Sequence, residues 1–346
     1  MKILITGGSG FIGTNFILDQ INKKNHILNV DKLSYASNHS LSNIINNDSY
    51  KFIKSDICDY EYISKIIFDY KPESIIHFAA ESHVDRSIDS PLECINNNIT
   101  GTLNLLHASR KYWNQKQRNF RFIHVSTDEV YGSLPNNGFF TENSQYKPNS
   151  PYSASKAATD HLVRAWVKTY GFPAIITNCS NNYGPFQFPE KLIPLIIIKS
   201  IDEKPLPVYG DGSNVRDWLH VDDHCRALDK ILMESKVGEK YNIGGNNEVK
   251  NIEIVKIICN TLDKLRPRKN KQKYSELITF VKDRPGHDFR YAINNSKIIK
   301  YLGWEPKETF ESGIKKTIQW YLNNEEWWRR IQNKTYNQSR LGLNDS

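Results

Sequence analysis

The sequence predicts an α/β protein with a doubly wound parallel sheet and a smaller C-terminal α/β domain. Short β-branched apolar runs alternate with longer amphipathic segments, the runs are almost continuously apolar, and a glycine-rich turn follows the first of them. Strand–helix alternation builds parallel sheets with right-handed crossovers. Strands that helices cover on both faces are apolar throughout, as these runs are.

The predicted strands are residues 2–6, 27–31, 51–56, 74–79, 121–126 and 174–179. Helical spacing of apolar residues predicts helices over residues 11–23, 60–70, 91–113 and 152–170. After about residue 180, loops rich in proline and glycine separate shorter elements. We therefore expect a sheet domain over residues 1–180, a smaller domain over 181–330 at the carboxyl edge of the sheet, and a polar tail over 331–346.

Composition excludes several classes of protein. The chain has 346 residues, of which 39% are hydrophobic and 24% charged, as is typical of a soluble globular protein. No apolar run approaches the roughly 20 residues that span a bilayer. The N-terminus, MKILITGGSG, has the pattern of a strand entering a glycine turn rather than of a secretion signal. We expect a cytoplasmic protein with no membrane partner.

Cysteines, histidines and net charge argue against metal and nucleic-acid sites. The five cysteines are scattered without a CxxC pair, which predicts reduced thiols and no zinc cluster. His220 and His224 have the spacing of zinc ligands on a helix, but no third ligand is evident, so we expect a helix-cap role and no metal. The net charge is +8, yet the densest basic stretch, residues 264–273, lacks interleaved aromatic side chains. We expect no nucleic-acid partner.

A glycine turn marks a candidate dinucleotide site. Gly8, Gly10 and Gly13 form the pattern G-x-G-x-x-G where the first strand ends, with Gly7 in front. Such a turn lets the backbone approach a pyrophosphate at a helix N-terminus, which predicts a Rossmann site. Glycines also occur in ordinary turns and helix caps, so the residues around the motif decide between the two interpretations. The acid Asp31 follows about 20 residues later, where it binds ribose hydroxyls and favours NAD over NADP.

Two further pairs of ionisable residues are relevant to a dinucleotide enzyme. Lys32 follows Asp31 and weakens the preference for NAD, while Asp56 ends the third strand and either reaches the adenine or caps the strand. Tyr152 and Lys156 are four residues apart, so they share one helix face, and a cation lowers the pKa of a phenol. Alone, this pair is also common on helix surfaces.

Polar residues at the end of the fifth predicted strand strengthen the case for catalysis. Thr127, Asp128 and Glu129 stand where a buried strand opens onto the carboxyl edge of the sheet. Carboxylates are costly to bury there, so a chemical role is favoured over turn capping. Two carboxyl groups with opposite tasks, one acid and one base, require separated pKa values.

The sequence resembles the dTDP-glucose 4,6-dehydratases, in the NDP-glucose 4,6-dehydratase branch of the extended short-chain dehydrogenase/reductase family. The resemblance runs in order from Lys2 to about Trp320 through TGGSGFIG, DKLSYASN, HFAAESHVDRS, STDEVYG, PYSASKA, NNYGPFQFPEKLIP, RDWLHVDDH and DRPGHDFRY. The Tyr–Lys pair marks the whole superfamily. The Thr-Asp-Glu triplet marks the dehydratase branch, because related 4-epimerases and decarboxylases lack the Asp in this arrangement.

The resemblance implies a hydro-lyase that converts an NDP-glucose into the 4-keto-6-deoxy sugar and water, in deoxysugar or rhamnose biosynthesis. Tyr152 would take the O4 proton while hydride passes to NAD, with Lys156 tuning the phenol and Thr127 bonding O4. Glu129 would then remove the C5 proton while Asp128 protonates the leaving O6. Hydride returns to C6, so NAD is regenerated.

The resemblance also implies binding residues. Those on the cofactor side are Gly7, Gly10, Phe11, Ile12, Gly13, Asp31, Lys32, Leu33, Ser34, Asp56, Ile57, Phe78, Ala79, Ala80, Glu81, Ser82, Asn97, Tyr152, Lys156 and Asn182. Those on the nucleotide-sugar side, mainly within residues 181–330, are Ser82, Thr127, Asn181, Lys191, Leu192, Pro207, Val208, Tyr209, Arg216, Asn251, Arg284 and His287. Asn97 replaces a frequent Thr, and either side chain forms hydrogen bonds. Arg216 and Arg284 suit a diphosphate, which a guanidinium grips with two hydrogen bonds.

Several alternatives stay open on the sequence alone. DRPGHDFRY and the flanks of STDEVYG favour dTDP, whereas DKLSYASN, HFAA, Asn97 and YGDGSNV resemble UDP-glucose 4,6-dehydratases. A nucleotide-sugar 4-epimerase shares the glycine turn and the Tyr–Lys pair, so Asp128 with Glu129 is the discriminator. A non-catalytic NAD-binding regulatory protein is expected to lack the Tyr–Lys pair. Family members usually form homodimers, here through helices 91–113 and 152–170.

Overall fold

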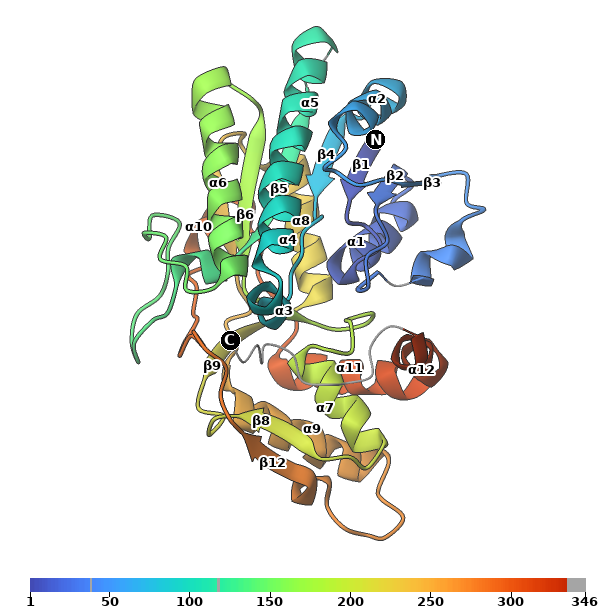
Figure 1. Ribbon diagram of the computed structural model, residues 1–346, viewed down its shortest axis with the longest axis vertical. Coiled ribbons are helices and arrows are strands. Elements are labelled where there is room, and N and C mark those ends of the chain that lie inside the picture. The colour runs from blue at the N-terminus through green and yellow to red at the C-terminus, as the bar shows by residue number, and fades with distance from the viewer. Residues whose placement is uncertain (38, 117–118, 335–346) are drawn as a thin grey trace.

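The computed structural model of the chain describes residues 1–37, 39–116 and 119–334. Residues 335–346 of the predicted polar tail therefore lie outside the described residues. The described chain forms two lobes, a sheet layered between helices and a smaller lobe that lies below the sheet in Figure 1. In this part of the chain every helix is too short or too polar to cross a lipid bilayer.

The larger lobe contains a seven-stranded parallel sheet in the order β10-β6-β5-β4-β1-β2-β3. Its strands are β1 (Lys2–Thr6), β2 (His26–Asp31), β3 (Tyr50–Lys54), β4 (Ser74–His77), β5 (Arg121–Thr127), β6 (Ala174–Cys179) and β10 (Lys240–Ile243). All six predicted strands form, with ends that differ by at most two residues from the prediction. The predicted fold class is confirmed.

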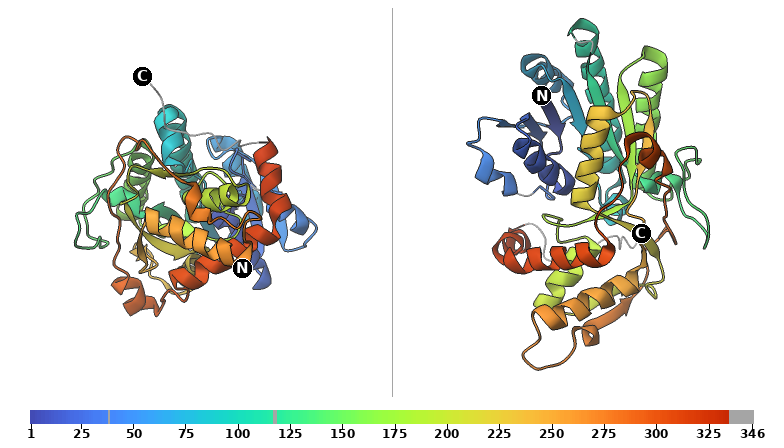
Figure 2. Two further views of the ribbon diagram at one scale, coloured as in Figure 1. Left: turned by 90° about the horizontal axis from the view of Figure 1, so that it is seen from below. Right: turned by 180° about the vertical axis from the view of Figure 1, so that it is seen from behind.

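Helices cover both faces of the sheet. α2 (Tyr60–Tyr70), α5 (Gly101–Lys116) and α6 (Pro151–Tyr170) lie on one face, and α1 (Phe11–Asn22) and α8 (Val221–Glu234) lie on the other (Figures 1 and 2). Successive residues of β1 alternate between the two cores, because Leu4 packs with α2 and α5 whereas Ile3 and Ile5 pack with α1. This two-sided burial explains why the strands are apolar throughout.

The predicted helix 91–113 is interrupted. It begins as α4 (Pro91–Ile95), widens into one π-helical turn, η2 (Asn96–Thr100), and continues as α5. Within this turn the Asn98 amide accepts a hydrogen bond from the backbone N–H of Glu81 at 2.8 Å and donates to the Ser155 hydroxyl at 2.8 Å. The wider turn thus places polar side chains at the cofactor side, a common use of π-bulges.

The smaller lobe is built from later segments. Its strands are β7 (Asn181–Tyr183), β8 (Leu206–Tyr209), β9 (Val215–His220), β11 (Glu248–Lys250) and β12 (Ile278–Val281). Its helices are α7 (Leu192–Ile201), α9 (Asn251–Leu265), α11 (Phe310–Asn323) and α12 (Glu325–Lys334), which share one apolar core. However, α8, β10 and α10 (Ser296–Leu302) return to the sheet lobe, so the boundary at residue 180 stays a prediction.

The sheet topology determines where ligands bind. Strand order reverses between β1 and β4, and open α/β sheets bind ligands outside the carboxyl ends of the strands at such a switch point. The smaller lobe lies beyond this carboxyl edge, so the two lobes face one another across it (Figure 1).

Candidate active site

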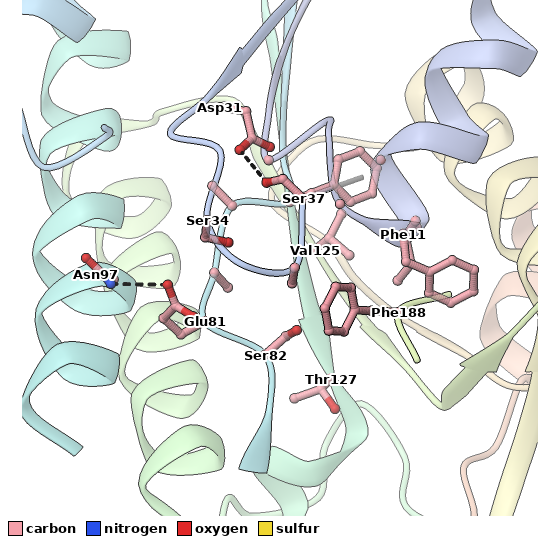
Figure 3. A pocket seen from close by; sticks show the side chains of 18 of the residues that line it. Phe11, Asp31, Ser34, Ser37, Glu81, Ser82, Asn97, Val125, Thr127 and Phe188 are labelled. Atoms are coloured by element: carbon pink, nitrogen blue, oxygen red, sulfur yellow. Dashed lines mark hydrogen bonds between the residues drawn. The ribbon is translucent and has the colours of Figure 1, made fainter. Parts of the chain in front are cut away.

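One cavity lies at the carboxyl edge, and its walls come from both lobes (Figure 3). Asp31 and Ser37 lie toward one end of it, whereas Ser82 and Thr127 lie toward the other. Every predicted cofactor residue except Leu33 lines this cavity: Gly7, Gly10, Phe11, Ile12, Gly13, Asp31, Lys32, Ser34, Asp56, Ile57, Phe78, Ala79, Ala80, Glu81, Ser82, Asn97, Tyr152, Lys156 and Asn182. The structure therefore brings together residues that lie far apart in the sequence.

The glycine turn is shaped for close contact with a ligand. Gly7 has φ +72°, and a Cβ there would lie 2.5 Å from the backbone nitrogen of Ala79. A Cβ on Gly13 would lie 2.6 Å from the carbonyl oxygen of Gly7, so helix and turn pack tightly. No side chain caps the start of α1 at Gly10, which leaves the first N–H groups of α1 at the cavity for a pyrophosphate.

Asp31 is held rigidly beside this turn. Its carboxylate accepts hydrogen bonds from the backbone N–H of Ser9 at 2.9 Å, from that of Leu33 at 2.8 Å and from the hydroxyl of Ser37 at 3.2 Å. Burial raises the pKa of Asp31, and these three donors oppose that shift. Leu33 contacts Asp31 through its backbone N–H, and Leu33 itself does not line the cavity.

Lys32 forms an ion pair at the cavity wall. Its ammonium pairs with the carboxylate of Glu81 at 3.0 Å, and the Asn97 amide donates to the same carboxylate at 3.3 Å (Figure 3 shows the second contact). The cation next to Asp31 is therefore already balanced by an acid. The preference for NAD that Asp31 predicts therefore stays the expectation at this site.

Tyr152 and Lys156 lie on the first turns of α6, one turn apart. Ser150 caps this helix and Pro151 starts it, so the register of the pair is well defined. The Lys156 ammonium donates to the carbonyl oxygen of Val125 at 2.8 Å, and both side chains line the cavity. Burial raises the pKa of Tyr152 well above its usual value and lowers that of Lys156.

Thr127, Asp128 and Glu129 form the turn that follows β5. The Thr127 hydroxyl accepts a hydrogen bond from the backbone N–H of Glu129 at 3.2 Å and so caps the short helix η3 (Asp128–Tyr131). Thr127 and Glu129 line the cavity, whereas Asp128 lies deeper and only 1% of its surface is exposed. In the described chain the Oδ2 atom of Asp128 has no hydrogen-bond partner.

The surroundings of the two carboxyl groups differ in charge. Burial, the negative charge of Glu129 and that of Asp217 raise the pKa of Asp128 well above its usual range. Burial also raises the pKa of Glu129, but the cations Arg284, Lys191 and Arg216 oppose this shift. The pKa of Asp128 is therefore raised more strongly than that of Glu129, which is the direction of separation that an acid and a base need.

The predicted nucleotide-sugar residues fall into two groups. Ser82, Thr127, Asn181 and Lys191 line the cavity, and the Lys191 ammonium donates to the carbonyl oxygen of Ser82 at 2.8 Å. The other eight do not line it: Leu192, Pro207, Val208, Tyr209, Arg216, Asn251, Arg284 and His287. Their binding role stays a prediction.

Three of these eight residues are held by contacts within the protein. Val208 is buried in the core of the smaller lobe, so only its backbone is available to a ligand. Arg216 donates to the carbonyl oxygens of Val215 and Asp288, at 2.8 and 2.9 Å, and so holds loops together. His287 pairs with Asp283 at 2.6 Å, while burial lowers the pKa of His287 to about 4.

Orphaned polar atoms support a polar ligand in the cavity. Within the described residues, Ser126 Oγ, Asn181 Oδ1 and Gln187 Oε1 are buried without hydrogen-bond partners, and all three residues line the cavity. Buried polar groups in native proteins are nearly always satisfied. A ligand with several donors and acceptors would satisfy them, and a dinucleotide with a sugar nucleotide fits this requirement.

Sequence reasoning missed part of the cavity wall: Val30, Ala36, Ser37, Ser55, Val125, Ser126, Cys179, Ser180, Gln187, Phe188 and Glu190. Most of them sit at or just beyond the strand ends, which is the one signal that could have found them. His224 was also missed as a support, since its ring bonds the Asn182 amide oxygen at 2.9 Å. His220 caps α8, as predicted.

The fold and the site together are those of the extended short-chain dehydrogenase/reductase class. The family model for GDP-mannose 4,6 dehydratase matches residues 4–317. The chain is 56% identical to the dTDP-glucose 4,6-dehydratase of Neisseria meningitidis serogroup B over 350 residues, which cover 99% of each chain. It is 55% identical to an Escherichia coli dTDP-glucose 4,6-dehydratase over 360 residues, with the same coverage. The chain belongs to the GDP-mannose 4,6-dehydratase family, among its dTDP-glucose 4,6-dehydratases.

Solved structures agree with this placement. The dTDP-glucose 4,6-dehydratase of Streptomyces venezuelae, with NAD and dTDP bound, has a TM-score of 0.88, 40% identity and coverage of 96% of this chain and 100% of that one. The UDP-glucose 4-epimerase of Thermotoga maritima has a TM-score of 0.83 and 27% identity, and the match covers 94% of this chain and 100% of that one. The fold is thus shared with epimerases, and the site must separate the two activities.

The pH dependence of water loss tests the unequal carboxyl pair. Elimination should be lost as the pH falls through the raised pKa of Glu129, because a protonated Glu129 accepts no proton. It should be lost again at high pH, where Asp128 ionises. Asp217→Asn removes a negative charge beside Asp128, so the pKa of Asp128 falls and the alkaline limb should move to lower pH. Single-turnover rates across pH measure this, and an unmoved alkaline limb would contradict it.

Proposed function

We propose that this protein removes water from dTDP-glucose to give dTDP-4-keto-6-deoxyglucose, with NAD as a recycled cofactor. The observation that carries the proposal is the placement of Asp128 and Glu129, with separated pKa values, beside a cavity that Tyr152 and Lys156 also line. Oxidation at C4 acidifies the C5 proton, so the pair then has a proton to remove and a hydroxyl to protonate.

NAD fits the cofactor half of the cavity. The open N–H groups at the start of α1 suit the pyrophosphate, and Asp31 suits the adenosine ribose. When bound, NAD supplies an acceptor for the C4 hydride and a donor that returns it to C6. Related dehydratases from Bacillus anthracis and Streptomyces venezuelae were solved with NAD, which supports the same cofactor here.

The protein residues then move protons in a fixed sequence. Tyr152 takes the O4 proton, helped by Lys156, while Thr127 donates a hydrogen bond to O4. Because burial raises the pKa of Tyr152, the phenol needs positive charge nearby to ionise, and Lys156 on the next turn supplies it. Glu129 takes the C5 proton and later returns it, while Asp128 gives its proton to O6, which leaves as water.

dTDP is the favoured nucleotide. The relatives that match at 55 and 56% identity are named dTDP-glucose 4,6-dehydratases, and the Streptomyces venezuelae structure holds dTDP. UDP-glucose remains the second candidate, because several sequence stretches resemble UDP-glucose dehydratases. The product would feed deoxysugar or rhamnose biosynthesis.

Two other functions fit less well. A 4-epimerase rotates and re-reduces its keto sugar, so it has no use for a buried Asp128 beside Glu129, and burying a carboxyl group with its Oδ2 atom unpartnered costs free energy. A regulatory NAD-binding protein has no need of the buried Lys156 ammonium beside Tyr152. Dehydration explains both features.

We also propose a cytoplasmic homodimer. All five cysteines are free, which suits a reducing compartment.

Leu92 on α4, Ile95 on α4 and Leu103 on α5 expose 83%, 43% and 38% of their surface, and these helices lie on the outer side of the sheet lobe (Figure 1). An apolar strip of this kind suits contact with a second copy through α4, α5 and α6.

Incubation with sugar nucleotides tests the activity itself. Purified protein with NAD is mixed with dTDP-glucose or UDP-glucose, and the 4-keto product is measured by its absorbance in alkali. We expect product from both or from dTDP-glucose alone, with the higher kcat/KM for dTDP-glucose. Unchanged substrate with both nucleotides would contradict dehydration, and a galactose product would instead identify an epimerase.

Two variants separate the steps. Tyr152→Phe should slow NADH formation about 100-fold or more, because the base for O4 is lost. Asp128→Asn should leave NADH formation near the wild-type rate but slow water loss about 100-fold, so that NADH accumulates. Stopped-flow absorbance of NADH measures the first step and product analysis measures the second. Tyr170→Phe, at the far end of the same helix, is the matched control.

The dimer has its own test. Leu92→Asp places a charge on the most exposed apolar side chain of the strip and should convert the dimer into a monomer in light scattering after gel filtration. Lys256→Asp, an exposed site on α9 in the smaller lobe, is the control and should stay dimeric. A wild-type protein with the mass of a single chain would contradict the dimer.

A further inference from the structure

The short helix α3 (Val84–Asp89) connects three parts of the active site. It follows Ser82, which lines the cavity, and it carries the sequence Val-Asp-Arg-Ser at its start. Three consecutive residues on it bind three different segments. Asp85 binds the smaller lobe, Arg86 binds Glu190 at 2.9 Å, and the Ser87 hydroxyl accepts the backbone N–H of Tyr152 at 3.1 Å.

Asp85 contacts two residues that the family resemblance assigns to the nucleotide sugar. Its Oδ1 atom accepts a hydrogen bond from Arg284 Nη1 at 2.7 Å, and its Oδ2 atom accepts one from the Tyr209 hydroxyl at 3.3 Å. Asp85 is 199 positions from Arg284 in the sequence and comes from the opposite lobe. With only 5% of its surface exposed, Asp85 is a buried acid committed to these partners.

The Arg284 guanidinium retains one donor that no described residue satisfies. Within the described residues, Arg284 Nε is buried without a hydrogen-bond partner. Asp85 therefore holds Nη1 while the Nε donor stays unused. A guanidinium with one edge fixed loses less conformational freedom when a phosphate oxygen binds the other edge.

Tyr209 is held in a corresponding way. Its hydroxyl is bonded to Asp85, and its ring contacts the His287 ring edge-on, with centroids 6.3 Å apart. Asp85 thus orients a cation and an aromatic ring together. Those are the two side-chain types that a nucleotide diphosphate requires, one for the phosphates and one for the base.

We propose that Asp85 is a positioning residue for the nucleotide diphosphate of the substrate, acting through Arg284 and Tyr209. This inference rests on the proposed function, since it assumes a nucleotide sugar as the ligand. Asp85 contributes to affinity and does not take part in proton transfer. Ser87, two residues further on, accepts a hydrogen bond from the backbone N–H of Tyr152. Helix α3 therefore contacts both Arg284 and the residue proposed as the base for O4.

The test measures binding of dTDP to the NAD-loaded protein by calorimetry. Asp85→Asn replaces a charge-assisted hydrogen bond with a neutral one and should weaken dTDP binding about 10-fold. KM for dTDP-glucose should rise by a similar factor, while kcat stays within about 2-fold. Asp69→Asn, an exposed site on α2, is the matched control and should bind dTDP like the wild type.

A double-mutant cycle separates positioning from general loss of structure. In an Arg284→Ala background, Asp85→Asn should lose most of its effect on dTDP affinity, because the residue that it orients is gone. An undiminished effect would overturn the proposal, as would tighter dTDP binding by Asp85→Asn, which would make Asp85 a competitor of the phosphate. If Asp85→Asn fails to fold, Asp85→Glu serves instead, and wild-type dTDP affinity in that longer variant would overturn the proposal.

The outcome is distinguishable from failure of the proposed function. A wild-type protein that binds dTDP but does not dehydrate dTDP-glucose refutes the activity, while the comparison of variants still tests Asp85. A wild-type protein that dehydrates dTDP-glucose, with an Asp85→Asn variant of equal dTDP affinity, refutes the positioning role alone. If the wild type binds no dTDP, the positioning proposal is refuted as well.

Discussion

The proposed chemistry depends on one constraint: two adjacent carboxyl groups, Asp128 and Glu129, lie in surroundings that shift their pKa values by different amounts. Asp128 lies next to Glu129 in sequence; Asp128 is buried and Glu129 is half-buried, so ionising both would be costly. Three cations oppose the pKa rise of Glu129, whereas Asp128 has Asp217 and Glu129 as its main charged neighbours. Two residues that differ by one methylene thus have different electrostatic surroundings, as the opposite roles proposed for them require.

The rest of the fold produces the different surroundings of Asp128 and Glu129. β5 delivers the triplet to the carboxyl edge, α6 places the Tyr–Lys pair across from it, and the smaller lobe contributes the cations. Lys191, Arg216 and Arg284 come from segments after residue 180, so the charges that oppose the pKa rise of Glu129 come from outside the predicted sheet domain. A sheet lobe alone would hold the residues without their separated pKa values.

Much of the sheet lobe could be predicted from the sequence, because strands buried on both faces leave continuous apolar runs. The exceptions have physical causes. β10 has four residues and lies far along the chain, so no local pattern assigns it to the sheet. The break of helix 91–113 at η2 was not expected either, because asparagines give no local signal for a π-turn that bonds Glu81.

The two halves of the site also differ in how far the sequence predicts them. The cofactor half follows from contiguous motifs at strand ends, which lie together in any doubly wound sheet. The nucleotide-sugar half depends on contacts such as that of Asp85 with Arg284, across 199 positions, which no spacing rule reveals. The pairing of Lys32 with Glu81, 49 positions apart, is likewise a contact that sequence position alone does not reveal.

The most direct test of the unequal pair is infrared spectroscopy of the NAD-loaded protein with isotopically labelled aspartate. At neutral pH we expect a protonated aspartic acid carbonyl band that disappears in Asp128→Asn and persists in Glu129→Gln. Absence of that band in the wild type, or its persistence in Asp128→Asn, would contradict the account.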